Sequence, residues 1–277
     1  MIGAAAAAGT FDRGRLFRID RDGVPPSYVY GTLHSNDPRV VALPETVVAA
    51  LAASRSAAFE TLLLEGDVAT FLAAARYEDG RRLTDHVDAE TFEKVRSALG
   101  GAAPDPAELV RTKPWAVLLM LAQTRDSGSA SLDGVLLAEA KARRLSVLSL
   151  ELPDEQVASL DAIPLASQLA LMRWALDTQR TRQAELEAAT RAWLAGDLAG
   201  LRHLSLQPGR RDRALAMHLR QLVKHVITDR NILMAHRLHL PLARGRVFVA
   251  VGALHLQGRD GLLALIRKQG YGITRVL

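Results

Sequence analysis

Two short motifs near opposite ends of the chain carry residues that could bind a metal ion or transfer protons. Residues 27–34 read SYVYGTLH and residues 246–255 read RVFVAVGALH, so each apolar run ends in the spacing G-x-x-H. A glycine lets the backbone approach closely, and an imidazole can ligate a metal or titrate near neutral pH. A single histidine at a strand end is more often structural, but the repeated motif leads us to expect His34 and His255 in one site.

A third apolar run, residues 56–60, ends in the carboxylate of Glu60. In open α/β sheets, ligands bind beyond the carboxyl ends of the strands. Two imidazoles and one carboxylate suit a divalent metal with open coordination positions. The alternative is a solvated glutamate at a strand terminus. We expect Glu60 to contribute little to folding, because a carboxylate in such a position buries little surface.

A second group of polar residues lies on a basic segment before the last strands and is spaced to fall near one helical stripe: His218, His225, Asp229 and His236. Histidines seven residues apart lie two helical turns, about 10 Å, from each other. We therefore interpret this group as a polar helix face rather than a metal site. Arg230 and Asn231 follow it and could orient a substrate carbonyl or carboxylate, although a surface arginine is the commoner outcome.

The predicted elements place strands near both termini and helices between them. Apolar runs and turn signals predict strands at 16–20, 27–33, 56–60, 145–150, 246–251 and 271–276. Caps and helical periodicity predict helices at 43–53, 67–77, 88–99, 105–123, 132–143 and 260–269, with further helices from 153 to about 239. We expect an α/β (α+β) fold of one domain, 1–277, with a central mixed sheet. Its first part is 12–65, a mainly helical insertion spans 66–240, and 241–277 closes the sheet.

Composition narrows the chemistry and the partners. The 277 residues contain no Cys, so any metal must be held by His, carboxylate or water. The net charge of +5 is scattered without a basic block, which argues against nucleic-acid binding. No apolar run is long enough to span a membrane. The small-residue tract at the start could be the remnant of a trimmed signal peptide, which would give a periplasmic or secreted protein; a cytoplasmic location is the alternative.

Several motifs taken together resemble the TraB/PrgY/GumN superfamily, which includes the TIKI metalloproteases. They are GTLH at 31–34, Glu60, LE at 150–151 with Gln156, RN at 230–231, and VAVGALHLQG at 249–258. Further similarity lies in KPW at 113–115, LDGVLLAEA at 132–140 and the GY before the last strand. The resemblance extends from about Arg15 to Val276, and the nearest branch is the GumN-like bacterial one.

The resemblance implies a fold like that of erythromycin esterases and ChaN-like haem-binding proteins. From the TIKI branch it implies peptide cleavage that depends on a divalent metal, with Mn or Co favoured and Zn or Fe as alternatives. By motif, the site residues would be the metal ligands His34 and His255, Glu60 as ligand or base, and Arg230 with Asn231; further candidates are Gly31, Gly252 and Glu151.

Two functions follow as expectations. The first is a metal-dependent hydrolase, with peptidase activity favoured, and its substrate would be a peptide or a small molecule. In this function Glu60 accepts a proton and Arg230 stabilises the oxyanion. The second is a peptide- or haem-binding protein without turnover, since the PrgY branch limits the activity of a peptide pheromone. The sequence does not predict the oligomeric state.

Overall fold

The computed structural model describes residues 11–62, 65–122 and 130–277. The N-terminal small-residue tract, on which the signal-peptide interpretation rests, lies mostly outside these ranges. The last residue of the helix predicted over 105–123 lies outside them as well.

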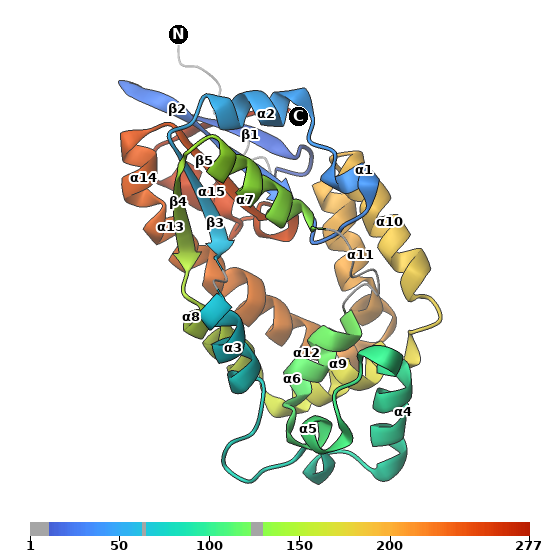
Figure 1. The fold of residues 1–277 in the computed structure, drawn as a ribbon. Coiled ribbons are helices and arrows are strands. Elements are labelled where there is room, and N and C mark those ends of the chain that lie inside the picture. Colours follow the sequence, from blue (N-terminus) through green and yellow to red (C-terminus); the bar gives the residue numbers. More distant parts are fainter. Residues whose placement is uncertain (1–10, 63–64, 123–129) are drawn as a thin grey trace.

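A mixed six-stranded sheet forms the centre of the molecule, in the order β4-β3-β5-β2-β1-β6 (Figure 1). Its strands are β1 (Leu16–Arg21), β2 (Val24–Thr32), β3 (Ser56–Thr61), β4 (Ser146–Glu151), β5 (Val247–Gly252) and β6 (Gly272–Arg275). The predicted α/β fold, with strands from both ends of the chain in one sheet, is therefore confirmed. The edge strand β4 comes from within the helical region.

Strands β4, β3, β5 and β2 run parallel to one another, whereas β1 is antiparallel to both β2 and β6. In the β2–β5 register Thr32 lies opposite Gly252, and in the β3–β4 register Thr61 lies opposite Glu151. The carboxyl ends of four strands consequently meet at one edge of the sheet, where the two G-x-x-H motifs follow β2 and β5.

Helices cover the sheet on both faces, and every residue of β5 is buried. The covering helices in Figure 1 are α2 (Glu45–Ala52) and α7 (Leu132–Ala142) in front, and α13 (Arg230–Arg237), α14 (His239–Arg244) and α15 (Leu262–Lys268) behind. Burial on both faces explains why β5 reads as a continuous apolar run instead of an alternating one. Short helix α1 (Pro38–Val41) and helices α10 (Arg182–Leu194) and α11 (Leu198–Arg211) lie beside the sheet.

The remaining helices form a lobe below the carboxyl edge of the sheet (Figure 1). They are α3 (Glu65–Ala74), α4 (Ala89–Leu99), α5 (Pro106–Arg111), α6 (Pro114–Ala122), α8 (Pro153–Asp161), α9 (Leu165–Asp177) and α12 (Arg213–Val223). Much of this lobe packs around apolar clusters separate from the core of the sheet, such as the one that includes Val117 and Met172. In the part of the chain that is described, no helix has the length and apolar character to cross a membrane.

The prediction of one helix over 105–123 is wrong, because two helices, α5 and α6, occupy this range. The break falls just before Pro114, which begins α6. Proline disfavours the helical conformation of the residue before it, so Thr112 and Lys113 turn the chain between the two helices.

Candidate functional site at the carboxyl edge of the sheet

Three of the predicted site residues converge on Gly252, the last residue of β5. A Cβ atom at Gly252 would lie 3.1 Å from Oε1 of Glu60, 3.6 Å from Cδ2 of His255 and 3.7 Å from Nε2 of His34. The Gly252 amide also donates a hydrogen bond to Oε1 of Glu60. Gly252 thus leaves open the small space that the three side chains surround.

Gly31, at the same position of the first motif, has a different task. A Cβ atom there would lie 2.7 Å from Cδ1 of Leu256 and 3.2 Å from the Cα of Ala253. The absence of a side chain at Gly31 therefore allows β2 to pack against the turn that carries His255 (η4, Ala253–His255). The two motifs are in direct contact through their own residues.

His34 lies on the open side of the site, with 70% of its side chain exposed. Its Nδ1 atom is 2.8 Å from Oδ2 of Asp133, and the other oxygen of Asp133 accepts a 2.8 Å hydrogen bond from the Thr32 hydroxyl. The hydrogen bond to Asp133 raises the pKa of His34 to about 9. Because Nδ1 faces Asp133, the Nε2 atom is the one that faces the site.

His255 lies on the closed side, with 4% of its side chain exposed. Its Nδ1 atom is 2.7 Å from Oδ1 of Asn231, and the amide nitrogen of Asn231 donates to the carbonyl oxygen of Asp260. This second bond orients the amide of Asn231 so that its oxygen accepts from Nδ1, which leaves Nε2 unprotonated in the neutral ring. Burial lowers the pKa of His255 to about 4.

Glu60 binds both the backbone and Arg230. Its Oε2 accepts a 2.8 Å hydrogen bond from Nη2 of Arg230, while Oε1 accepts from Gly252 and lies 3.7 Å from Nε2 of His255. Burial alone would raise the pKa of this carboxyl, but the charges of His255, Arg230 and His34 and the Gly252 amide lower it to about 2. With 12% of its side chain exposed, Glu60 is a partly buried ion-pair residue. This burial rules out the alternative of a solvated glutamate, and the premise that the Glu60 carboxylate buries little surface was wrong.

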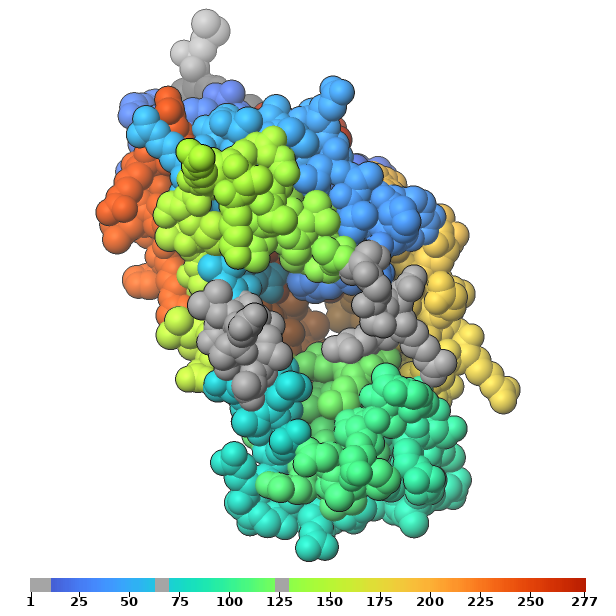
Figure 2. Space-filling model, in the orientation of Figure 1, coloured from blue at the N-terminus to red at the C-terminus, as the bar shows by residue number. Residues whose placement is uncertain are grey.

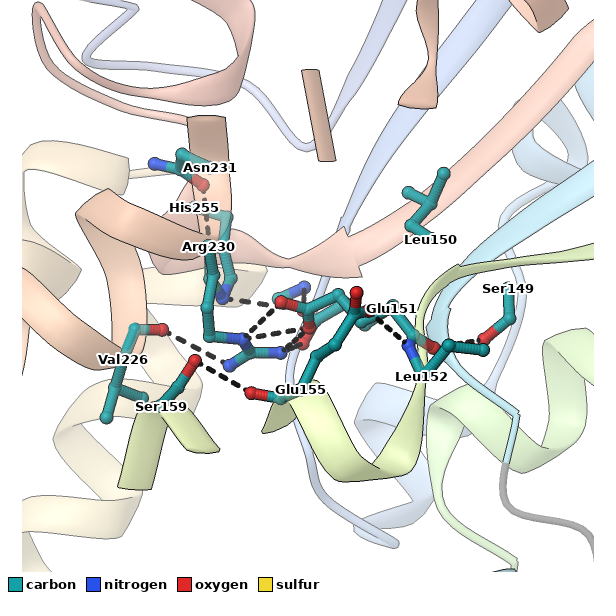
Figure 3. Close-up of polar contacts among 12 residues, drawn as sticks. Ser149, Leu150, Glu151, Leu152, Glu155, Ser159, Val226, Arg230, Asn231 and His255 are labelled. Atoms are coloured by element: carbon teal, nitrogen blue, oxygen red, sulfur yellow. Dashed lines mark hydrogen bonds and ion pairs between the residues drawn. The ribbon is translucent and has the colours of Figure 1, made fainter. Parts of the chain in front are cut away.

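Arg230 is buried between two carboxylates (Figure 3). Its Nε and Nη2 atoms bind Glu151 at 2.5–3.0 Å, Nη2 also binds Glu60, and Nη1 donates to the carbonyl oxygen of Val226. The side chain of Glu151 is 0% exposed, and burial raises its pKa although Arg230 acts in the opposite direction. These contacts favour a role for Arg230 in holding Glu60, because few of its N–H groups remain to meet an oxyanion.

A π-helical turn, η3 (Lys224–Asp229), leads directly into Arg230 and was not predicted. Such turns are rare in proteins, and those that occur are often found at functional sites. Here the turn is followed by two consecutive residues that both reach the site, Arg230 toward the carboxylates and Asn231 toward His255. In the second polar group, His218 bonds Ser167 and His225 pairs with Asp229, so these residues have local partners instead of a common centre.

Asp133 and Thr32 are site residues that sequence reasoning missed. Asp133 lies in the first turn of α7, directly after the capping residue Ser131 and Leu132. The only signal in the sequence was its position in the LDGVLLAEA motif, which alone does not indicate contact with His34. The pairing of α7 with the end of β2 is a tertiary contact between distant segments.

The donor atoms of the site suit a divalent metal, although they do not form a closed set of ligands. Among residues 11–62, 65–122 and 130–277, no group of three or more His, Asp or Glu side chains is arranged to hold an ion as it stands. The chemistry nevertheless fits, because His34 and His255 each direct Nδ1 to an oxygen acceptor, as metal-ligating histidines do. Because Gly252 has no side chain, Nε2 of His34 and Oε1 of Glu60 can both approach its Cα.

A groove of about 1560 Å³ starts at His34 and continues toward the helical lobe. Its walls come from the loop after β2 and from α4, α6, α9 and α10, and they include apolar residues such as Met120 and Leu186 and charged ones such as Lys94 and Arg182. Figure 2 shows the molecule hollowed between the sheet and the lobe. His34 therefore lies where the groove meets the sheet.

The model of the TraB/PrgY/gumN family matches residues 16–275, which is nearly the whole chain. No curated protein and no solved structure matches the chain.

Proposed function

Because the chain belongs to the TraB/PrgY/gumN family, we propose that it is a metal-dependent hydrolase, a peptidase whose site comprises His34, His255 and Glu60. The proposed metal is a divalent ion, with manganese or cobalt as the first choices. The observation that carries the proposal is the arrangement of the two histidines. Each has its Nδ1 engaged by an oxygen atom, and both imidazoles and the carboxylate of Glu60 approach the same glycine, Gly252.

Anchoring of Nδ1 has a direct consequence for ligation. A histidine whose Nδ1–H is held by a carboxylate or carbonyl oxygen presents the lone pair of Nε2 to a metal. A purely structural histidine needs no free Nε2, yet both motifs of this chain have this geometry. Since His34 carries an extra proton at neutral pH in the metal-free protein, ligation also requires that proton to leave.

The residues of the chain supply the acid–base chemistry. When bound, a divalent ion would lower the pKa of a water molecule and polarise the scissile carbonyl. Glu60 is ionised at neutral pH and is the group placed to accept the proton of the attacking water. Arg230 keeps Glu60 charged and in position, and Asn231 orients His255. We therefore assign Arg230 and Asn231 to positioning, and Glu151 to neutralising the buried guanidinium of Arg230.

The groove supports a chain-like substrate over a small molecule. Sites for small molecules commonly have volumes of about 300–1,000 Å³, whereas this groove measures about 1560 Å³ and opens at the side of His34. Its mixture of apolar and charged wall residues suits a peptide with varied side chains.

The test is incubation of a diverse peptide mixture with the protein in the presence of Mn²⁺ or Co²⁺, followed by mass spectrometry of new termini. We expect cleavage by the native chain and none by the double variant His34→Ala/His255→Ala. The matched control is His203→Ala/His239→Ala, which removes two exposed histidines on other helices and should keep the activity. Stoichiometric capture of peptide or haem without new termini would instead support the non-catalytic alternative.

A further inference from the structure

We infer that Asp133 is a positioning residue of this site, which fixes the orientation and the tautomer of His34 by binding Thr32 and His34 at once. The effect of Asp133 on metal binding rests on the proposed function. The effect of Asp133 on the orientation of His34 rests on the geometry alone.

Asp133 bridges two residues of the first motif with its two oxygen atoms. Oδ1 accepts the hydroxyl of Thr32 at 2.8 Å and Oδ2 lies 2.8 Å from Nδ1 of His34. Thr32 is the last residue of β2, where it is buried and pairs with Gly252. One end of the carboxylate is thus fixed to the rigid sheet, and the other end holds an imidazole that is otherwise 70% exposed.

The helix that carries Asp133 is itself docked at this point. The backbone amide of Leu132 donates to the carbonyl oxygen of Ser35 at 3.0 Å, so the start of α7 binds the chain on the far side of His34. The helix begins at the N-cap Ser131, and an acidic side chain in a first helical turn is stabilised by the helix dipole. Asp133 is therefore held at a defined position, from which it can restrict His34.

An exposed imidazole needs such a restraint more than a buried one. His255 is enclosed by protein and keeps its orientation through packing as well as through Asn231. His34 has little packing, so its bond to Asp133 is the main contact that directs Nε2 toward Glu60 and Gly252. Loss of a hydrogen-bond partner of a metal-ligating histidine typically weakens metal affinity by about 10–100-fold.

The experiment compares Asp133→Ala, Asp133→Asn and Thr32→Val in two measurements. The first is the affinity for Co²⁺ by calorimetry. The second is the position of the ring proton of His34 in the metal-free protein, measured by ¹⁵N NMR at a pH well above its pKa of about 9, where the ring is neutral. We expect Asp133→Ala to weaken Co²⁺ binding about 10–100-fold and to remove the preference for Nδ1–H in the neutral ring. Asp133→Asn keeps an oxygen that can accept from Nδ1, so it should retain part of the Co²⁺ affinity and part of the preference for Nδ1–H. Thr32→Val should give values between those of the native chain and Asp133→Ala.

Asp161→Ala is the matched control for a merely structural role. Asp161 also accepts two side-chain bonds, from Lys113 and from Trp115, and links two elements outside the site. It should lower the thermal midpoint without changing either measurement. If Asp133→Ala has native Co²⁺ affinity and a native His34 spectrum, Asp133 only ties α7 to β2 and the inference is overturned. If the native protein binds no divalent ion, the proposed function fails, and the NMR measurement alone decides the role of Asp133.

Discussion

The Oε2 atom of Glu60 lies 2.8 Å from Nη2 of Arg230, and both side chains are largely withdrawn from solvent. The same guanidinium group binds Glu151, so one buried cation is placed between two carboxylates from neighbouring parallel strands. One of these carboxylates faces Gly252 and the histidines, and the other is enclosed. Under the proposed function, this difference assigns the reacting role to Glu60 and the supporting role to Glu151.

Glu60→Gln should reduce both stability and activity. The carboxylate accepts from Gly252 and from Arg230 with different oxygen atoms, whereas the amide of glutamine has one oxygen only. One of the two donors is then left without a partner, at a cost of about 1–3 kcal/mol. Urea denaturation checks the stability and peptide cleavage checks the activity. A variant of native stability with unchanged activity would show that Glu60 is not needed at this site.

Arg230→Met should be among the most destabilising substitutions near the site. It leaves the buried carboxylates of Glu60 and Glu151 without a cation, and breaking a buried pair costs about 3–5 kcal/mol. The double variant Arg230→Met/Glu151→Leu should recover part of this loss, because it removes one of the two stranded charges.

The matched control is Arg237→Met, whose partner Glu155 forms a pair that is about one-third exposed on both sides. Such a pair contributes about 1 kcal/mol or less. Equal losses of stability in the two arginine variants, measured by urea denaturation, would contradict a stabilising role for the buried network of Arg230, Glu60 and Glu151.

The stability of the metal-free protein should rise with pH between about 4 and 6.5 because of His255. Burial lowers its folded pKa to about 4, whereas an unfolded histidine titrates near 6.5. Within this window the unfolded chain binds more protons, so stability is present above 6.5 and is lost as the pH falls toward 4. A pKa shift of this size corresponds to a change on the order of 3 kcal/mol in the free energy of unfolding across this pH window. The measurement is the denaturation midpoint as a function of pH. In His255→Gln the rise of the midpoint with pH should be smaller than in the native chain, and an unchanged rise would show that other groups cause it.

The two motif glycines should respond differently to alanine. Gly252→Ala puts a methyl group 3.1 Å from Oε1 of Glu60 and into the space shared with both histidines, so we expect a large loss of Co²⁺ affinity with a modest loss of stability. Gly31→Ala would crowd Leu256 and the backbone of Ala253, and overpacking of this kind costs about 1–3 kcal/mol. Calorimetry measures the Co²⁺ affinity of both variants and thermal melting measures their stability. Native Co²⁺ affinity in Gly252→Ala would contradict the prediction.

The strands and the ends of the two motifs could be predicted because their evidence is local. Residues 247–251 form an apolar run that is typical of a strand buried on both faces, and the structure has β5 there. The glycine before each histidine marked close backbone approach, which the structure shows at Gly31 and Gly252. Hydrophobic periodicity and turn chemistry act over a few residues and can be read directly.

The partners of the site residues could not be predicted because they come from distant segments. Asp133 reaches His34 across 99 positions, and Arg230 reaches Glu60 across 170. Nothing in the periodicity of residues 211–238 indicated the π-helical turn that precedes Arg230. The same lack of tertiary information produced the error at Glu60, since its burial results from Arg230 and Gly252.

The position of β5 in the sheet also governs the order in which the chain can fold during synthesis. β5 lies between β3 and β2, yet residues 247–252 leave the ribosome after almost all of the other strands. Until they emerge, β3 and β2 have no common neighbour, and the helical lobe can pack only around its own apolar clusters. Such late, long-range strand pairing is slow because the loop must close before its contacts form. Glu60 and His34 therefore lack Gly252 and His255 until that point, and any activity of this site can begin only after the C-terminal segment has been released and inserted.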